Sequence, residues 1–385
     1  MINIKIKEVK KKAEKKAFMM LPFDIYKDNE YWVPPLLLDL RYMFRLNGFI
    51  DGLLGAKGEH PFYEYGQIQL YLAYKENKLV GRIAAINNDT YNELRPEEGG
   101  TGFFGFFECI NDQEVANALF DSAKEWLKKR NLTKMQGPAS PTSNYEYGLL
   151  TKGFNDSPKI DMPYSHEYYQ TLFENYGMPC RQDLLAYKVD AKTVFNNEKF
   201  IRGAALVKKR YNVGIKPINM KDLHNEVKKI KDIYNRAWQP QWGTIPQTDA
   251  EIDGYAEKFK LIAIPELIPF VYVNGELAGM AVAVLDFNFI LKAMKGRLFP
   301  YGYKIFTERK KVKWIRVIVL GLFPEFQGKG IDTVVYKHLV DTALEKGFTL
   351  CEGSAIWADN DMMNRGMKAV SGEVYKEYKV YETEI

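Results

Sequence analysis

The chain has 385 residues, with 54 Lys and Arg against 49 Asp and Glu, so its formal net charge at pH 7 is only +5. A chain of this length is expected to form two or three domains, and 46% hydrophobic residues are enough for packed cores. The small charge excess gives no reason to expect nucleic-acid binding, which needs a concentrated basic surface. Three cysteines and four histidines, all scattered, argue against a disulfide framework and a metal site.

The sequence also lacks the apolar segments that direct proteins into membranes. Its longest apolar runs are the length of a strand and fall far short of the roughly 18 residues of a transmembrane helix. The start of the chain alternates apolar and charged residues and does not resemble a signal peptide. Scattered cysteines suit a reducing compartment. We therefore expect a cytoplasmic protein without membrane insertion.

The first half of the chain is predicted to contain a β-hairpin, an apolar strand, two helices and a closing strand. An apolar run ends at Tyr74, a polar turn follows, and Leu79 and Gly81 come next, which is the pattern of a hairpin. Apolar residues at helical spacing mark the first helix. The predicted elements are the hairpin 72–86, the strand 103–107, helices around 115–127 and 164–177, and the strand 184–189.

The second half repeats this order after a helix over about 223–234. Its hairpin has the same spacing, with Tyr272 followed by Leu277 and Gly279. The later elements are the strand 314–320, helices around 335–343 and 360–372, and the strand 374–382.

The shared order indicates an internal duplication. The first long helices of the two halves align at a constant offset of 220 residues, for example Leu119 with Leu339. The lysine-rich stretch around 190–212 is the candidate boundary, so we predict domains 1–205 and 206–385. The fold class is α/β (α+β): two units, each a mainly antiparallel, twisted sheet flanked by helices.

A glycine-rich loop in the second half carries the clearest chemical signal. The apolar strand that includes Leu320 and Leu322 runs into Gln327-Gly328-Lys329-Gly330, and a helix follows. Two glycines allow a tight turn and close approach of a ligand, and the amides at a helix start suit a phosphate. The loop is neither a Walker A sequence nor GxGxxG.

A hairpin, an apolar strand and then Pro-x-x-Gln-Gly-x-Gly-Ile opening a helix together resemble motif A of the GNAT superfamily, the acyl-CoA-dependent N-acyltransferases. With the duplication, the resemblance covers most of the chain and is to tandem GNAT proteins, in an uncharacterised bacterial branch. It implies transfer of an acyl group, from acetyl-CoA or another acyl-CoA, to the amine of a small molecule or peptide. No metal is implied.

The resemblance also implies which residues bind the donor. In the family, loop amides hold the CoA pyrophosphate, and the preceding strand pairs with pantetheine and polarises the thioester. An asparagine opens the next helix. The corresponding positions are Leu320, Leu322, Gln327, Gly328, Lys329, Gly330, Ile331 and Asn360.

The first half departs from this pattern at the loop. Its corresponding residues, Phe107 to Asp112, contain no glycine and include Glu108, so a pyrophosphate would meet a carboxylate and bulky side chains. We therefore expect the first half not to bind CoA and to be structural or to face the acceptor.

The second half departs at two further positions. Asp332 stands where the family has Gly or Ala, and we expect it to cap the helix, as Asp112 does in the first half. The family's general acid, a tyrosine, is replaced by Met367, and the matching residue of the first half is Phe173. Neither side chain can donate a proton to the leaving thiolate.

The reaction also needs a base that accepts a proton from the acceptor ammonium. Glu352, on a predicted strand beside the acyl site, is the first candidate and Asp359 the second. In the first half, a loop rich in turn residues and the tyrosines after it combine amide, carboxylate and hydroxyl groups. These form a candidate acceptor site, lodged between the halves, whose residues are Asn144, Glu146, Tyr164 and Tyr168.

Two other functions fit the sequence. A Fem-like aminoacyl transferase shares the tandem fold, but it takes aminoacyl-tRNA and has no use for the glycine loop. A non-catalytic CoA- or acyl-binding protein would explain Met367 and Asp332. The sequence leaves the acceptor, the acyl chain and the oligomeric state open.

Overall fold

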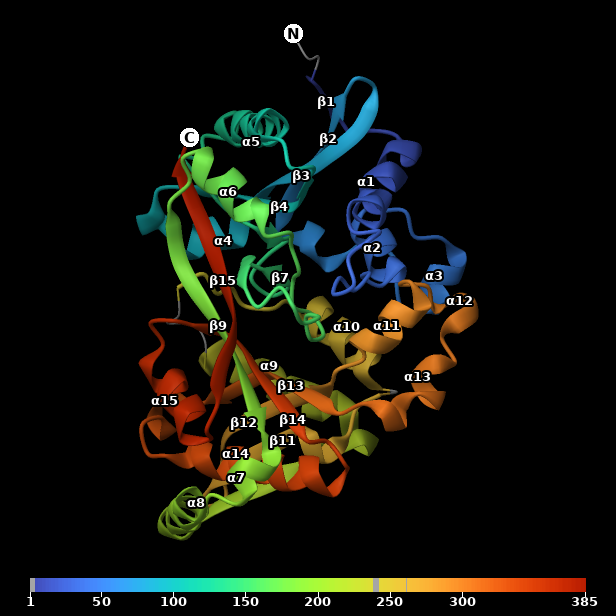
Figure 1. The fold of residues 1–385 in the computed structure, drawn as a ribbon. Coiled ribbons are helices and arrows are strands. Elements are labelled where there is room, and N and C mark those ends of the chain that lie inside the picture. Colours follow the sequence, from blue (N-terminus) through green and yellow to red (C-terminus); the bar gives the residue numbers. More distant parts are fainter. Residues whose placement is uncertain (1–3, 238–241, 261) are drawn as a thin grey trace. The chain divides into compact units, whose positions relative to one another are not determined.

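The computed structural model describes residues 4–237, 242–260 and 262–385 (Figure 1). The chain divides into two compact units, each assembled from separate stretches of sequence. Unit 1 comprises Met1–Asp183, Asn288–Lys304 and Tyr378–Ile385, and unit 2 comprises Leu184–Phe287 and Ile305–Glu377. The units therefore differ from two contiguous stretches divided at residue 205. None of the described helices is both long and apolar enough to span a bilayer.

Unit 1 is a mainly antiparallel sheet with helices, and the short strand β8 also pairs with β15 of this sheet. Its sheet has the order β1-β2-β3-β4-β5-β15, in which only β4 and β5 are parallel. The strands are β1 (Ile4–Glu8), β2 (Gly66–Lys75), β3 (Lys78–Asn88), β4 (Thr101–Cys109), β5 (Lys134–Gly137) and β15 (Glu373–Glu384), with the short strands β6 (Ala139–Ser140), β7 (Glu146–Tyr147) and β8 (Leu149–Lys152). The helices are α1 (Lys12–Ile25), α2 (Leu37–Met43), α3 (Phe49–Leu53), α4 (Asp89–Leu94), α5 (Gln113–Lys128), α6 (Tyr168–Asn175), α11 (Asn288–Met294) and α12 (Leu298–Tyr301), and α13 (Lys304–Thr307) follows α12.

The core of unit 1 forms where α5 packs against the sheet. The helical stripe predicted from the sequence is buried here, including Leu119, Ala123 and Leu127. Phe173 of α6 and Tyr381 of β15 complete the same cluster. Each large apolar side chain buried in this way contributes about 1.5–3 kcal/mol, so the packing of α5 anchors the loops at its two ends.

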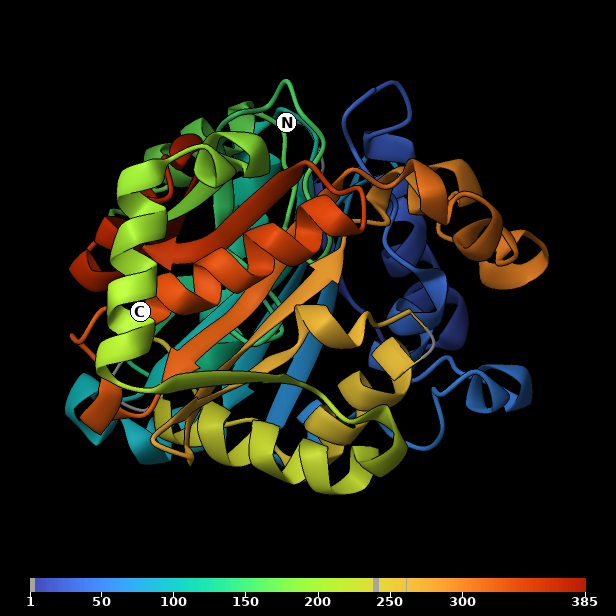
Figure 2. The same cartoon turned by 90° about the horizontal axis from the view of Figure 1, so that it is seen from below.

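Unit 2 repeats the arrangement. Its sheet has the order β9-β14-β13-β12-β11-β10, again with one parallel pair, β13 and β14. Figure 2 shows α9 and α14 on either side of these strands. The strands are β9 (Cys180–Asp190), β10 (Val213–Pro217), β11 (Pro269–Val273), β12 (Glu276–Leu285), β13 (Trp314–Leu322) and β14 (Leu350–Trp357). The helices are α7 (Ala191–Phe195), α8 (Glu198–Arg210), α9 (Leu223–Ala237), α10 (Asp249–Lys260), α14 (Ile331–Glu345) and α15 (Asp361–Ala369).

The two sheets correspond strand for strand, which confirms the predicted fold class. Both predicted hairpins form, β2–β3 and β11–β12, and a helix follows the parallel-paired strand in each unit, α5 after β4 and α14 after β13. Each unit takes its closing strand from the other half of the sequence. The last residues of β15 pair with β5 in unit 1, whereas most of β9 pairs with β14 in unit 2.

Candidate functional site

The glycine loop of unit 2 joins the end of β13 to the start of α14. Gly328 and Gly330 both have left-handed backbones, with φ of +70° and +75°, which residues with a Cβ rarely adopt. A Cβ on Gly328 would meet nothing within 4 Å. In the part of the chain that the structure describes, the N–H groups of Gly328, Lys329 and Gly330 donate to no protein acceptor. The loop therefore presents unpaired donors at a helix N-terminus, where the helix dipole also favours an anion.

Two side chains hold this loop in shape. The Nε2 of Gln327 donates to the carbonyl oxygen of Leu322 at 2.9 Å and so ties the loop to the end of β13. The Nζ of Lys329 donates to the carbonyl oxygen of Glu325 at 2.7 Å. In this structure Gln327 positions the loop and its amide points at the protein.

Asp332 does not cap the helix, contrary to the sequence prediction. The N-cap is Gly330, so α14 begins two residues earlier than α5 does at the equivalent Asp112. Asp332 lies in the first turn instead, where burial raises the pKa of its carboxyl group.

The edge of β13 that faces β14 is unpaired over its second half, and we call this unpaired edge the slot. The parallel pairing of these strands ends at Val317 and Gly353, although β13 continues to Leu322 and β14 to Trp357. Beyond this point no strand among the described residues pairs with that edge of β13. The side chains from Val317 to Leu320 are only half buried although they lie in the middle of a sheet. The open edge leaves backbone N–H and C=O groups for an extended ligand.

The other predicted donor-binding residues surround these two features. Leu322 is buried at the end of β13, and Ile331 is the fully buried first residue of α14. Asn360 caps α15, because its Oδ1 accepts a hydrogen bond from the N–H of Met363 at 3.1 Å. Sequence reasoning thus placed Asn360 correctly at a helix start.

Glu352 lies in a buried polar cluster on β14. It has no exposed surface, and its two carboxylate oxygens accept hydrogen bonds from Ser354, at 2.5 Å, and from Tyr375. The Nε of Arg316 lies 3.5 Å from the same carboxylate and donates to Ser354 Oγ at 2.9 Å. This is the geometry of an ion pair inside the sheet. Because the carboxylate of Glu352 has no exposed surface, a substrate amine cannot reach it.

The remaining catalytic positions lie apart from this cluster. Asp359 is exposed in the turn before α15. Met367 is buried in the core of unit 2, with its sulfur facing Gly353, and Phe173 is buried in the core of unit 1. Both positions of the family's tyrosine therefore hold core side chains.

The corresponding slot of unit 1 is filled by the chain itself. The short hairpin of β6 and β7 follows β5, and a Cβ on Gly105 would lie 1.7 Å from the carbonyl oxygen of Ala139. The N–H of Phe106 donates to Ser140 Oγ at 2.9 Å. At the start of α5, the carboxylate of Asp112 already accepts from the amides of the first turn. Both features that are open in unit 2 are thus occupied in unit 1.

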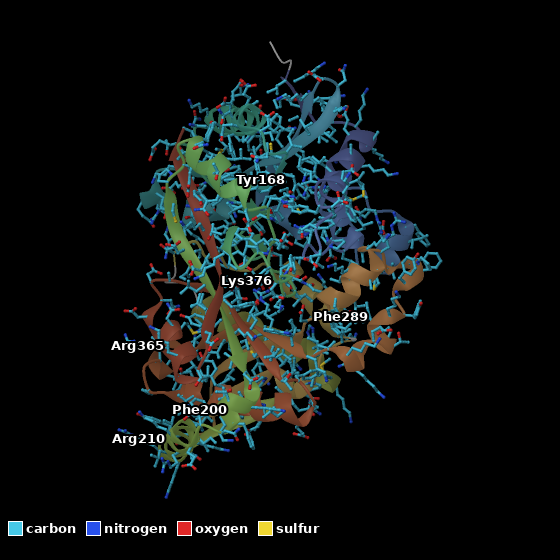
Figure 3. All side chains as sticks on the ribbon, in the orientation of Figure 1. Tyr168, Phe200, Arg210, Phe289, Arg365 and Lys376 are labelled. Carbon is cyan, nitrogen blue, oxygen red and sulfur yellow. The ribbon has the colours of Figure 1, made fainter. Side chains whose placement is uncertain are left out.

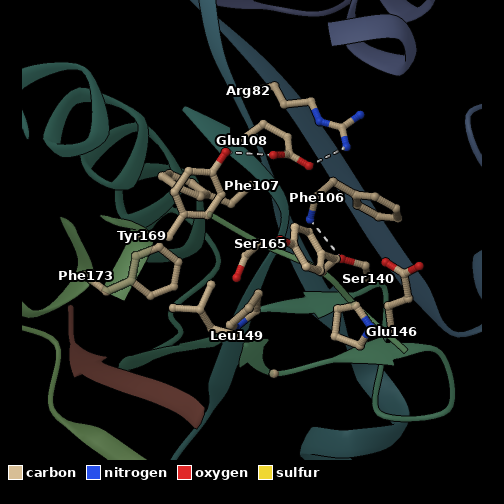
Figure 4. A pocket seen from close by; sticks show the side chains of 14 residues that line it. Arg82, Phe106, Phe107, Glu108, Ser140, Glu146, Leu149, Ser165, Tyr169 and Phe173 are labelled. Carbon is tan, nitrogen blue, oxygen red and sulfur yellow. Dashed lines mark hydrogen bonds and ion pairs between the residues drawn. The ribbon is translucent and has the colours of Figure 1, made fainter. Parts of the chain in front are cut away.

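A cavity of about 80 Å³ lies beside this hairpin in unit 1 (Figure 4). Its polar wall includes Arg82, Glu108 and Tyr169. The hydroxyl of Tyr169 donates to Glu108 Oε2 at 2.7 Å, and Arg82 Nη2 lies 3.6 Å from Glu108 Oε1. The cavity is lined by Arg82, Phe106, Phe107, Glu108, Pro138, Ser140, Glu146, Gly148, Leu149, Pro163, Tyr164, Ser165, Tyr169 and Phe173.

Glu146 is the titratable group of this cavity best suited to proton transfer. Protein atoms crowd its carboxyl group even though solvent reaches the side chain, and the resulting desolvation raises its pKa to about 7. The charges of Asp161 and Glu108 raise this pKa too, whereas Arg82 lowers it. Within the described residues its carboxylate accepts no hydrogen bond. Burial likewise raises the pKa of Glu108, which Arg82 partly offsets.

The structure brings together only part of the predicted acceptor site. Glu146 and Tyr164 line the cavity, whereas Asn144 and Tyr168 do not. The hydroxyl of Tyr168 donates to the carbonyl oxygen of Cys109 at 2.7 Å, and Figure 3 shows this residue on α6.

The sequence analysis did not predict that Arg82 lines this cavity and pairs with Glu108. A signal was present, because an arginine inside the otherwise apolar strand β3 must find a buried partner.

Comparisons with known proteins agree with this architecture. Residues 227–362 match the acetyltransferase (GNAT) family. The chain is 30% identical to the bacterial ceramide synthase of Caulobacter vibrioides, over 99% of this chain and 97% of that protein. It is 28% identical to protein YghO of Escherichia coli, over 97% and 94%.

Among solved structures, the fold resembles a tandem GNAT protein from the clavulanic acid biosynthesis pathway, with a TM-score of 0.55 and 12% identity. That match covers 99% of this chain and 98% of the other. The described residues contain no group of three or more His, Cys, Asp or Glu side chains that could hold a metal ion. The chain belongs to the acetyltransferase (GNAT) family, as a tandem member.

Proposed function

We propose that this protein is an acyl-CoA-dependent N-acyltransferase that binds its donor at the glycine loop of unit 2. The observation that carries the proposal is the open loop with unpaired amides at the start of α14. In the reaction, an acceptor amine attacks the thioester carbonyl, an amide bond forms, and the C–S bond breaks to release CoA. The proton lost by the amine passes to a base.

We assign donor binding to the chain around this loop. The amides of Gly328, Lys329 and Gly330 would hold the pyrophosphate, with Gln327 keeping the loop closed. Backbone groups near Leu320 and Leu322 would pair with the pantetheine arm and stabilise the oxyanion. Ile331 and Asn360 fix the starts of the two neighbouring helices.

We assign acceptor binding and proton transfer to the unit 1 cavity. A base works best when its pKa lies near the working pH, and the pKa of Glu146 is about 7. Glu146 then replaces Glu352 as the first candidate base, because the carboxylate of Glu352 is buried and already hydrogen-bonded. Asp359 stays the second candidate. Tyr164 lines the cavity, whereas Asn144 and Tyr168 would support it from outside.

The leaving group does not require a protein acid. A thiol has a pKa of about 8.5, so CoA can depart as a thiolate and take its proton from water. This is compatible with Met367 and Phe173 at the two positions of the family's tyrosine.

The name of one relative indicates a class of acceptor amines to test. A ceramide is an amide of a fatty acid with a long-chain amino alcohol, so the relative called bacterial ceramide synthase is named for an amide product. An acceptor screen should therefore pair acetyl-CoA with small amines, and a long-chain acyl-CoA with sphingoid bases. Turnover with any pair excludes a non-catalytic binding protein, and binding of charged tRNA in place of CoA would favour a Fem-like transferase.

Donor binding is tested by isothermal titration of acetyl-CoA into Gly330→Glu. The substitution puts a carboxylate and a strained backbone at the phosphate site, so binding should become undetectable. Gly347→Glu is the matched control: Gly347 follows the other end of α14, also has a left-handed backbone, with φ of +88°, and has open space around it. This control should bind like the wild type. Equal binding by both variants, or none by the wild type, would refute the assignment.

A further inference from the structure

Helix α3 of unit 1 has its apolar side outward. Asp51 is buried and paired with Arg41 at 2.5 Å, whereas Phe49 and Leu53 are 83% and 72% exposed. Ile50 and Leu54 are exposed as well. A helix that belonged only to a soluble surface would show the opposite pattern. Contiguous exposed apolar side chains of this size mark an interaction surface.

A second exposed apolar segment belongs to the same unit. Phe299 of α12 is 87% exposed, and Phe289, Tyr301 and Tyr303 are also exposed. Figure 3 shows Phe289 on α11. The N–H of Leu37, which begins α2, donates to the carbonyl oxygen of Gly296, at the turn between α11 and α12. In Figures 1 and 2, α3 and α12 lie toward the same side of unit 1.

Positive charge accompanies these apolar residues. The stretch 288–313 contains eight Lys and Arg and one Glu, so the rest of the chain carries two more acidic than basic residues. Within unit 1 this stretch holds Lys292, Lys295, Arg297 and Lys304 and no acidic residue. Next to α3, the acidic side chain Glu59 is paired with Arg45. In unit 1, these four basic side chains lie in the same stretch as the exposed aromatic side chains.

We propose that α3 and α11–α12 form a docking surface for an anionic membrane. Exposed aromatic and aliphatic side chains next to lysine and arginine are what an interfacial segment needs: the apolar groups enter the acyl boundary and the cations meet the headgroups. A second copy of the chain is a poor occupant, because two surfaces of the same positive charge would repel. The surface lies outside the proposed donor and acceptor sites, so the inference does not depend on the proposed function.

The test is sedimentation of the full chain with lipid vesicles. The wild type should pellet with vesicles of equimolar phosphatidylglycerol and phosphatidylcholine and stay in solution with phosphatidylcholine alone. Lys295→Glu/Arg297→Glu, which reverses two charges, should weaken binding about tenfold or more, and so should Phe49→Ser/Leu53→Ser, which removes two inserting side chains. Phe195→Ser, at a residue of α7 that is 52% exposed, is the matched control and should bind like the wild type.

Circular dichroism spectra and thermal midpoints show whether each variant is folded. Failure of the wild type to pellet with anionic vesicles would overturn the proposal. So would equal binding to neutral vesicles, or unchanged binding by both folded double variants.

Discussion

Replacement of Glu146 by glutamine should lower kcat/KM for acyl transfer about 100- to 10,000-fold, the usual contribution of a positioned base. The glutamine keeps the size of the side chain and removes its ability to accept the ammonium proton. The measurement is the initial rate of CoA release with an acceptor identified by the screen. Glu167→Gln, an exposed glutamate that does not line the cavity, is the control and should retain wild-type activity.

The pH dependence of kcat/KM shows whether Glu146 acts as a base or only contacts the acceptor. For the wild type, kcat/KM should rise as the pH passes through about 7, because only the ionised carboxylate of Glu146 accepts a proton. Glu146→Gln should lose this rise. An unchanged profile in the variant, or full activity, would rule out Glu146 as the base.

Glu146→Gln should lose activity but gain stability at high pH. The pKa of Glu146 is raised in the folded state, from 4.5 to about 7, so the native state disfavours the ionised carboxyl. The contribution of Glu146 to the free energy of unfolding is fully present below the pKa of the unfolded state, and it is lost as the pH rises from about 4.5 through 7. Glu146→Gln should therefore be more stable than the wild type at pH 8 and no more stable at pH 4. Such a gain with lost activity is expected of a functional residue.

Glu352→Ala should lower the free energy of unfolding by about 3–5 kcal/mol, because it removes the carboxylate that neutralises the buried charge of Arg316. Chemical denaturation measures the change. Arg316→Leu/Glu352→Leu removes both charges and should cost less than the single substitution. Asp359→Ala, an exposed aspartate in the same unit, should change stability by no more than about 0.5 kcal/mol.

The result also decides between the two glutamates. If Glu352→Ala were as stable as the wild type but inactive, Glu352 would be the base and the structural interpretation of its cluster would be wrong.

Elements defined by local pattern were predictable from the sequence. Apolar runs that end in a polar turn, with the same spacing of Leu and Gly after it, located both hairpins. The stripe that includes Leu119 located α5, because the helical period follows from backbone geometry alone. The offset of 220 residues then predicted the repeated unit. The glycines of the loop also stand where sequence reasoning placed them, at the entrance of α14.

Features that depend on distant contacts were not predictable. The Glu108 carboxylate meets Tyr169, which is 61 residues away, and nothing in the local sequence of either residue indicates the other. The burial of Glu352 against Arg316 was not predictable either, because a glutamate on a strand has the same local sequence pattern whether its side chain faces solvent or a buried arginine. The start of α14 was misplaced because Asp is a strong N-cap, whereas the left-handed Gly330 begins the helix two residues earlier.

The central claim is that only one of the two similar units binds an acyl-CoA, because its loop and slot are open and those of the other unit are filled. The stoichiometry of acetyl-CoA binding to the wild-type chain, measured by isothermal titration, tests this directly. We predict one molecule per chain. Two molecules per chain, or none, would contradict the account.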